Sequence, residues 1–149
     1  MYGKSGALSS YGRMANSNND PMQQIVMLYD GAIKFLRLAA ADIEAKDIPQ
    51  KAEHTNRALD IITYLQGILD FELGGEVAAT LDNLYTHVSM KVLRASATLD
   101  ANAMQAAADL LMPVRDSWMV VAAASIDNSA ANHAVVTAGV QPRLGRMVA

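Results

Sequence analysis

Cysteine is absent from the 149 residues, and its absence excludes two kinds of site. Without thiols the chain can form neither a disulfide framework nor a thiolate metal centre. The lack of disulfides fits a reducing cytoplasm. The length and a hydrophobic fraction of 52% instead predict one folded domain with a core of its own.

Long apolar runs are also missing. The densest run, MVVAAASI at 119–126, is far shorter than the roughly 20 residues needed to cross a membrane. The N-terminal stretch, MYGKSGALSSYGRMANSNND, contains no apolar segment of signal-peptide length. We therefore expect no membrane insertion and no cleaved leader, and we expect the protein in the cytosol.

An excess of positive charge is lacking as well, since the formal net charge is −3. Nucleic acids and anionic membranes bind mainly to basic surfaces. Neither is therefore expected as the main partner.

The familiar motifs of catalysis and metal binding do not occur. The three histidines, His54, His87 and His133, are never four residues apart, so no helical zinc pair exists. The Glu-x-x-His motif of di-iron bundles is absent. Gly74-Gly75 lacks the lysine and hydroxyl residue that complete a phosphate-binding loop. The sequence thus predicts no catalytic residue, no metal site and no cofactor, and we expect that the protein is not an enzyme.

What is present is helical periodicity. Apolar residues recur at helical spacing in four segments, 21–46, 50–72, 76–98 and 102–122, and no segment alternates like a strand. Asp20-Pro21 is typical of a helix start, and Gly74-Gly75 predicts a break. The pattern predicts an all-α, antiparallel four-helix bundle over residues 20–125. A flexible N-terminal arm at 1–19 and a flexible tail at 126–149 are expected to flank it.

The first helical segment carries two apolar stripes where an ordinary bundle helix carries one. The core stripe contains Met22, Ile25, Tyr29, Ile33, Leu36 and Ala40, and a roughly opposite stripe contains Met27, Leu28, Gly31, Phe35 and Leu38. Gly31 costs the helix about 1 kcal/mol relative to alanine, but it permits close approach of another backbone. Two interpretations stay open. Either this helix is central in its own bundle, or the second stripe lines a groove for another chain's helix.

Pro113 lies inside the fourth segment, where proline removes a backbone donor and costs a regular helix about 3 kcal/mol. We expect a kink near Asp109 and Leu110, or a break into two helices. Met112 and Met119 lie off the core face of this segment, as scattered surface residues or as part of a binding patch.

Several short motifs, in order, resemble the flagellin export chaperones of the FliS family. They are MLYDGA at 27–32 with FL at 35–36, GGEVA at 74–78, LxxLY at 81–85 and RDxW at 115–118. Tyr2 and Tyr11 resemble the tyrosines of the family's N-terminal arm, and the resemblance covers about residues 1–122. The family's arginine-leucine pair followed by Ala-Asn is replaced here by the looser MKVLRAS at 90–96, and residues 127–149 have no counterpart.

The resemblance implies a function. Members of the family bind the disordered C-terminal segment of new flagellin in the cytoplasm and prevent premature polymerisation. They then present the complex to the cytoplasmic domain of the flagellar type III export gate, without using ATP. A homodimer of the free protein stays open, and the alternative function is a self-associating structural bundle without a client.

Apolar residues in or beside the stripes are the candidate contacts for a disordered client, which would fold onto the bundle as it binds. These flagellin-binding candidates are Leu28, Gly31, Phe35, Leu38, Ile61, Leu65, Ile68, Tyr85, Met112 and Met119. An open apolar groove favours aggregation. We therefore expect the N-terminal arm, with Tyr2, Leu8 and Tyr11, to cover part of the groove as a plug that the client displaces.

Overall fold

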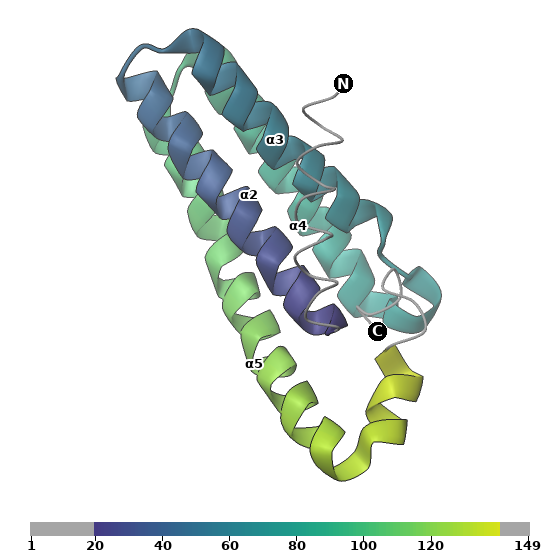
Figure 1. The fold of residues 1–149 in the computed structure, drawn as a ribbon. Helices are drawn as coiled ribbons and strands as arrows, with labels where there is room; N and C mark the ends of the chain where they lie inside the picture. The colour runs from purple at the N-terminus through teal and green to yellow at the C-terminus, as the bar shows by residue number, and fades with distance from the viewer. Residues whose placement is uncertain (1–19, 141–149) are drawn as a thin grey trace.

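Four helices form an antiparallel bundle (Figure 1). The computed structural model describes the backbone of residues 20–140 and the side chains of residues 20–124, and residues 20–140 contain no strand. The helices are α2 (Pro21–Glu44), α3 (Ile48–Gly67), α4 (Phe71–Thr98) and α5 (Ala101–Val140). Each packs against the next in the chain, and α2 also packs against α5, which closes the ring. The predicted fold class is confirmed.

An aspartate caps the start of each helix. The Asp20 carboxylate accepts a hydrogen bond from the Met22 amide at 3.0 Å, and Asp100 accepts one from the Ala103 amide at 2.9 Å. Asp47 and Asp70 cap α3 and α4 in the same way. Because the first amides of a helix have no partner within it, such caps fix where each helix begins. The connections at 45–47, 68–70 and 99–100 are consequently short.

The helix boundaries differ from the expected ones in two places. Gly74-Gly75 does not end an element: α4 begins at Phe71, and Gly75 kinks it with φ 48° and ψ −122°. This is possible because Asp70 caps a first turn and glycine tolerates a positive φ. At the other end of the chain, α5 continues to Val140, beyond the bundle end expected at 125, through a segment rich in alanine, the best helix former.

Pro113 does not divide the fourth helix, since α5 is continuous through it. Of the two expected outcomes, the break into two helices is therefore excluded. Pro113 lies on the exposed side of α5, where water can solvate the carbonyl that lacks a proline donor.

The arm at 1–19, with Tyr2, Leu8 and Tyr11, and residues 141–149 lie outside the described residues. The flexibility of the two ends and the plug therefore stay predictions.

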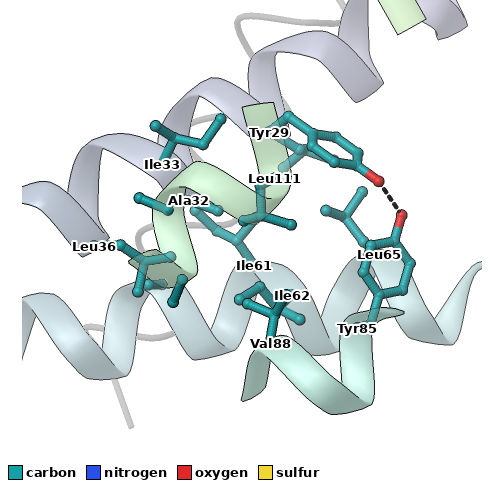
Figure 2. Close-up of a cluster of buried hydrophobic side chains, with 14 of the residues drawn as sticks. Tyr29, Ala32, Ile33, Leu36, Ile61, Ile62, Leu65, Tyr85, Val88 and Leu111 are labelled. Atoms are coloured by element: carbon teal, nitrogen blue, oxygen red, sulfur yellow. Dashed lines mark hydrogen bonds between the residues drawn. The ribbon is translucent and has the colours of Figure 1, made fainter. Parts of the chain in front are cut away.

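The core stripe predicted for the first helix is buried along its full length. Figure 2 shows how it meets side chains of the other helices, including Ile61 and Leu65 from α3 and Leu111 from α5. Within this core the hydroxyls of Tyr29 and Tyr85 lie 2.5 Å apart and form a buried hydrogen bond between α2 and α4. Burial raises the pKa of both phenols, that of Tyr29 to about 12, so both are neutral in the folded protein at neutral pH.

Candidate functional site

Helix α2 is covered on two sides, because α3 packs against one side and α5 against the other. Leu28, in the second apolar stripe, is only 5% exposed, and Gly31 is also buried. For these two residues the structure supports the first interpretation, a helix that is central in its own bundle. The surplus apolar surface of α2 is therefore largely used inside the molecule.

Five of the ten candidate contacts are interior, which corrects their expected place on the surface. They are Leu28, Gly31, Ile61, Leu65 and Tyr85. For Leu28 and Gly31, the helical wheel could not show that α2 is flanked on both sides, so it left their stripe available for a groove. A role of these five residues in client binding stays a prediction, and it would require the bundle to open.

The other five candidates are accessible. Phe35, Leu38, Ile68 and Met112 are half-buried, and Met119 is 44% exposed. They come from α2, from α5 and from the connection after α3 rather than from one continuous groove. Phe35 lies at the seam between α2 and α3, and Met112 lies at the seam between α2 and α5.

The seam between α2 and α3 is built around the ring of Phe35. This ring stacks on His54 of α3, with centroids 6.0 Å apart and planes 21° apart, and the Arg57 guanidinium lies 5.9 Å from its centroid. His54 is held in place by Asp42, whose carboxylate oxygen lies 2.6 Å from Nδ1. The ring is thus fixed in one orientation with part of its surface open, which suits an apolar side chain of a partner.

The seam between α2 and α5 is bracketed by opposite charges. Arg115 of α5 donates from Nε to Asp30 of α2 at 2.7 Å, and this hydrogen bond raises the pKa of the guanidinium. Arg37 and Asp109 approach to 3.9 Å farther along the same two helices. Met112 is three residues from both Asp109 and Arg115, so it lies on the same face of α5, between the two ion pairs.

The motifs that carry the family resemblance meet in space. Asp30 of MLYDGA pairs with Arg115 of RDxW, and Tyr29 of the first motif bonds to Tyr85 of LxxLY. Residues 27–32, 81–85 and 115–118 therefore join three different helices. Within the single chain, these contacts stabilise the packing of α2 against α4 and α5.

The largest uncovered apolar side chains near the kink in α4 were missed by the sequence analysis. Phe71, Leu73 and Val77 are each more than half exposed. The helical periodicity of residues 76–98 predicts Val77 in the core stripe, but in the structure Val77 is exposed and Ala78 is buried instead. Leu73 precedes the kink at Gly75 and Val77 follows it, so helical spacing does not relate the two side chains. The sequence offered no periodic signal for this exposed group, because the chain was expected to break at Gly74-Gly75 and not to continue as a helix from Phe71.

The described residues meet neither the requirements of a metal site nor those of a membrane-spanning helix. Among them, no three His, Asp or Glu side chains come close enough to hold a metal ion. No helix within residues 20–140 is long and apolar enough to span a membrane.

A closed four-helix bundle with large apolar side chains left on several outer faces has the features of a protein-binding helical module. The model of one protein family, "Flagellar protein FliS", matches residues 4–125. The chain belongs to the FliS family.

Curated relatives agree with this assignment. The chain is 31% identical over 102 residues to the "Flagellar secretion chaperone FliSB" of Pseudomonas aeruginosa, which covers 68% of this chain and 81% of the relative. It is 36% identical over 99 residues to the "Flagellar secretion chaperone FliS" of Salmonella typhimurium, covering 66% of this chain and 73% of the relative. The Bacillus subtilis protein of the same name is 27% identical over 110 residues, covering 74% and 81%.

Proposed function

We propose that the protein is a cytoplasmic export chaperone that binds the C-terminal segment of flagellin. Binding keeps flagellin from polymerising before export, and the chaperone then delivers it to the cytoplasmic domain of the flagellar type III export gate. The observation that carries the proposal is the family match over residues 4–125, which includes all the ordered motifs.

The uncovered apolar residues suit a client that wraps around the bundle. A large apolar side chain gains about 1.5–3 kcal/mol when it is fully buried, and Phe71, Leu73 and Val77 have about half of that left to gain. Ordering one client residue costs about 1–2 kcal/mol of backbone entropy. The gain from burying one half-exposed side chain is thus about as large as the cost of ordering one client residue. A single apolar patch therefore cannot hold a disordered segment. Contacts at the two seams of α2 and at the start of α4 would have to act together.

The mechanism proposed here is binding alone. The client folds onto the chaperone, and the apolar segment that would pair with other flagellin subunits is covered while it is bound. Release follows when the export gate competes for the complex. No chemical step by the chaperone is part of this proposal.

Titration calorimetry with full-length flagellin and with flagellin truncated at its C-terminus tests the proposal. We expect 1:1 binding of the full-length protein with a negative heat-capacity change, and no binding of the truncated one. Equal affinity for both would contradict it. A free protein that dimerises in sedimentation experiments and binds neither form would favour the self-associating bundle instead.

A further inference from the structure

A pocket of about 530 Å³ opens between α4 and the first turn of α5, away from the seams of α2. His87, Met90, Lys91 and Arg94 of α4 line it, together with Asp100 and Ala103 at the start of α5. We refer to it as the basic pocket. None of the residues proposed above to contact flagellin takes part in it.

Positive charge gathers at this pocket and is left unpaired. His87, Lys91 and Arg94 follow one another by four and three residues, so they share one face of α4. In the part of the chain that the structure describes, Lys91 and Arg94 form no ion pair. The carboxylate of Asp100 caps α5 through the Ala103 amide. On a protein with a net charge of −3, two such cations mark a place for negative charge from outside.

Apolar surface accompanies this charge. Met90, inside the pocket, and Leu93, beside it on α4, are both more than half exposed. A second hollow, of about 410 Å³, adjoins the basic pocket and shares Thr98 and Asp100 with it. Both hollows lie at the end of the bundle where α4 turns into α5. A ligand suited to this surface therefore carries apolar groups as well as negative charge.

Leu99 adds further apolar surface at this end of the molecule. It lines the second hollow, and its backbone is left-handed, with φ 54° and ψ 46°. A residue with a side chain is strained in this conformation, and glycine usually occupies this position after a helix. Leu99 is nevertheless 49% exposed, so about half of its surface is open to a partner.

We propose that the basic pocket and Leu99 form a second docking site, which takes an acidic, amphipathic segment of a partner protein other than flagellin. Carboxylates of the segment would face Lys91 and Arg94, and its apolar face would cover Met90 and Leu99. The positive charge of Lys91 and Arg94 favours an acidic partner over a neutral or basic one. The two terminal segments of this chain do not match the basic pocket in charge. Residues 1–19 and residues 141–149 each carry two basic side chains and no acidic one.

A second copy of the chain fits less well than an acidic segment. A two-fold symmetric contact through this surface would bring the two basic clusters together, and like charges repel across an interface. Two lysine or arginine side chains on an acidic protein are also few for nucleic acid.

Fluorescence anisotropy with two labelled helical peptides tests this site in the full-length protein. Both peptides carry leucines on one face, and the other face carries glutamates in the first peptide and lysines in the second. We expect the acidic peptide to bind and the basic one not to bind. The double variant Lys91→Glu/Arg94→Glu should weaken acidic-peptide binding at least about tenfold. The double variant Lys34→Glu/Arg57→Glu changes net charge equally beside Phe35, away from both hollows, and should leave acidic-peptide binding unchanged.

Leu99→Gly separates binding from folding. Glycine fits the left-handed backbone, so the melting temperature should hold or rise while the acidic peptide binds several-fold more weakly. The proposal is overturned if both peptides bind equally, or if Lys91→Glu/Arg94→Glu binds like the parent protein. It is also overturned if polyglutamate without leucines, duplex DNA or anionic vesicles bind more tightly than the acidic peptide. Flagellin binding by Lys91→Glu/Arg94→Glu should be unchanged, which keeps this test independent of the proposed function.

Discussion

At the scale of single residues, position along the motif does not reveal what a side chain does. Leu28 and Phe35 belong to the same apolar stripe of α2, but Leu28 is buried and Phe35 is half-open against His54. A hydrophobic residue on a wheel can face either the core or a partner, and only the packing of neighbouring helices decides. A substitution should therefore mainly reduce stability where the side chain is buried, and mainly reduce binding where the side chain is open to a partner.

Ile61→Asp and Phe35→Asp should behave differently. Ile61 is fully buried, so an unpaired carboxylate there should lower the free energy of unfolding by about 3–5 kcal/mol. At Phe35 the new charge can reach water, and the loss of stability should be about 1–2 kcal/mol while flagellin binding falls at least about tenfold. Denaturant unfolding followed by circular dichroism, beside a flagellin pull-down, measures both. Equal destabilisation by the two changes would place Phe35 in the core.

The tyrosine pair makes a second residue-scale prediction. Tyr85→Phe leaves the buried hydroxyl of Tyr29 without its partner on α4 and should cost about 1–3 kcal/mol. The double change Tyr29→Phe/Tyr85→Phe removes both polar groups and should cost less than the sum of the two single changes. A double-mutant cycle by urea unfolding gives the coupling. If the two effects simply add, the hydroxyls do not stabilise each other.

At the scale of helices, prediction from sequence succeeded where polar and apolar faces are distinct. The core stripe predicted for α2, from Met22 to Ala40, is buried at every position. In α5 the prediction was partly wrong. The expected core stripe was Ala107, Leu110, Leu111, Val114, Trp118 and Val121. Ala107 and Leu111 are buried as expected, but Leu110 and Val121 are exposed and Ala108 is buried instead. Small apolar residues occur on every side of α5, so the hydrophobic periodicity could not identify its buried face. Close packing against α2 favours alanines over larger side chains at the contact.

The candidate site was less predictable than the fold for the same reason. The resemblance indicated that the protein binds a client, and the apolar pattern indicated which residues were available. Whether Tyr85 or Met119 is open depends on contacts between helices that are far apart in the sequence. The uncovered Phe71, Leu73 and Val77 depend on the backbone of one glycine, which no periodicity encodes.

The kink of α4 can be tested at that glycine. Gly75→Ala should destabilise the protein by about 1–3 kcal/mol, because φ 48° with ψ −122° is unfavourable for any residue with a side chain. A methyl group itself would meet no atom within 4 Å, so the cost is in the backbone. Gly67→Ala is the matched control: its surroundings are equally open and its backbone is not left-handed. That change should stabilise by about 0.5–1 kcal/mol. Thermal melts that rank the two variants the other way would disprove the backbone argument.

At the scale of the whole molecule, apolar surface is left uncovered on more than one face. Such surface makes the free protein prone to associate, and a covering segment would reduce that tendency. The arm at 1–19 directly precedes α2 in the sequence, and its Tyr2, Leu8 and Tyr11 are the candidates for this covering role.

Deleting residues 2–12 tests the plug. The shortened protein should bind flagellin faster or more tightly, because the client no longer competes with the arm, and the effect should be small because a tethered plug binds weakly. The free protein should also self-associate more, as light scattering would detect. Weaker flagellin binding after the deletion would instead make the arm a direct contact.

The closed ring has a consequence for how the molecule is made. One side of α2 packs against α5, and α5 is the last of the four described helices to be synthesised. At roughly 5–20 residues per second, several seconds pass between the emergence of α2 and that of its final partner. During synthesis this protein therefore exposes an apolar helix of its own. For a short time the nascent chain is as prone to associate through apolar surface as the client it is proposed to bind.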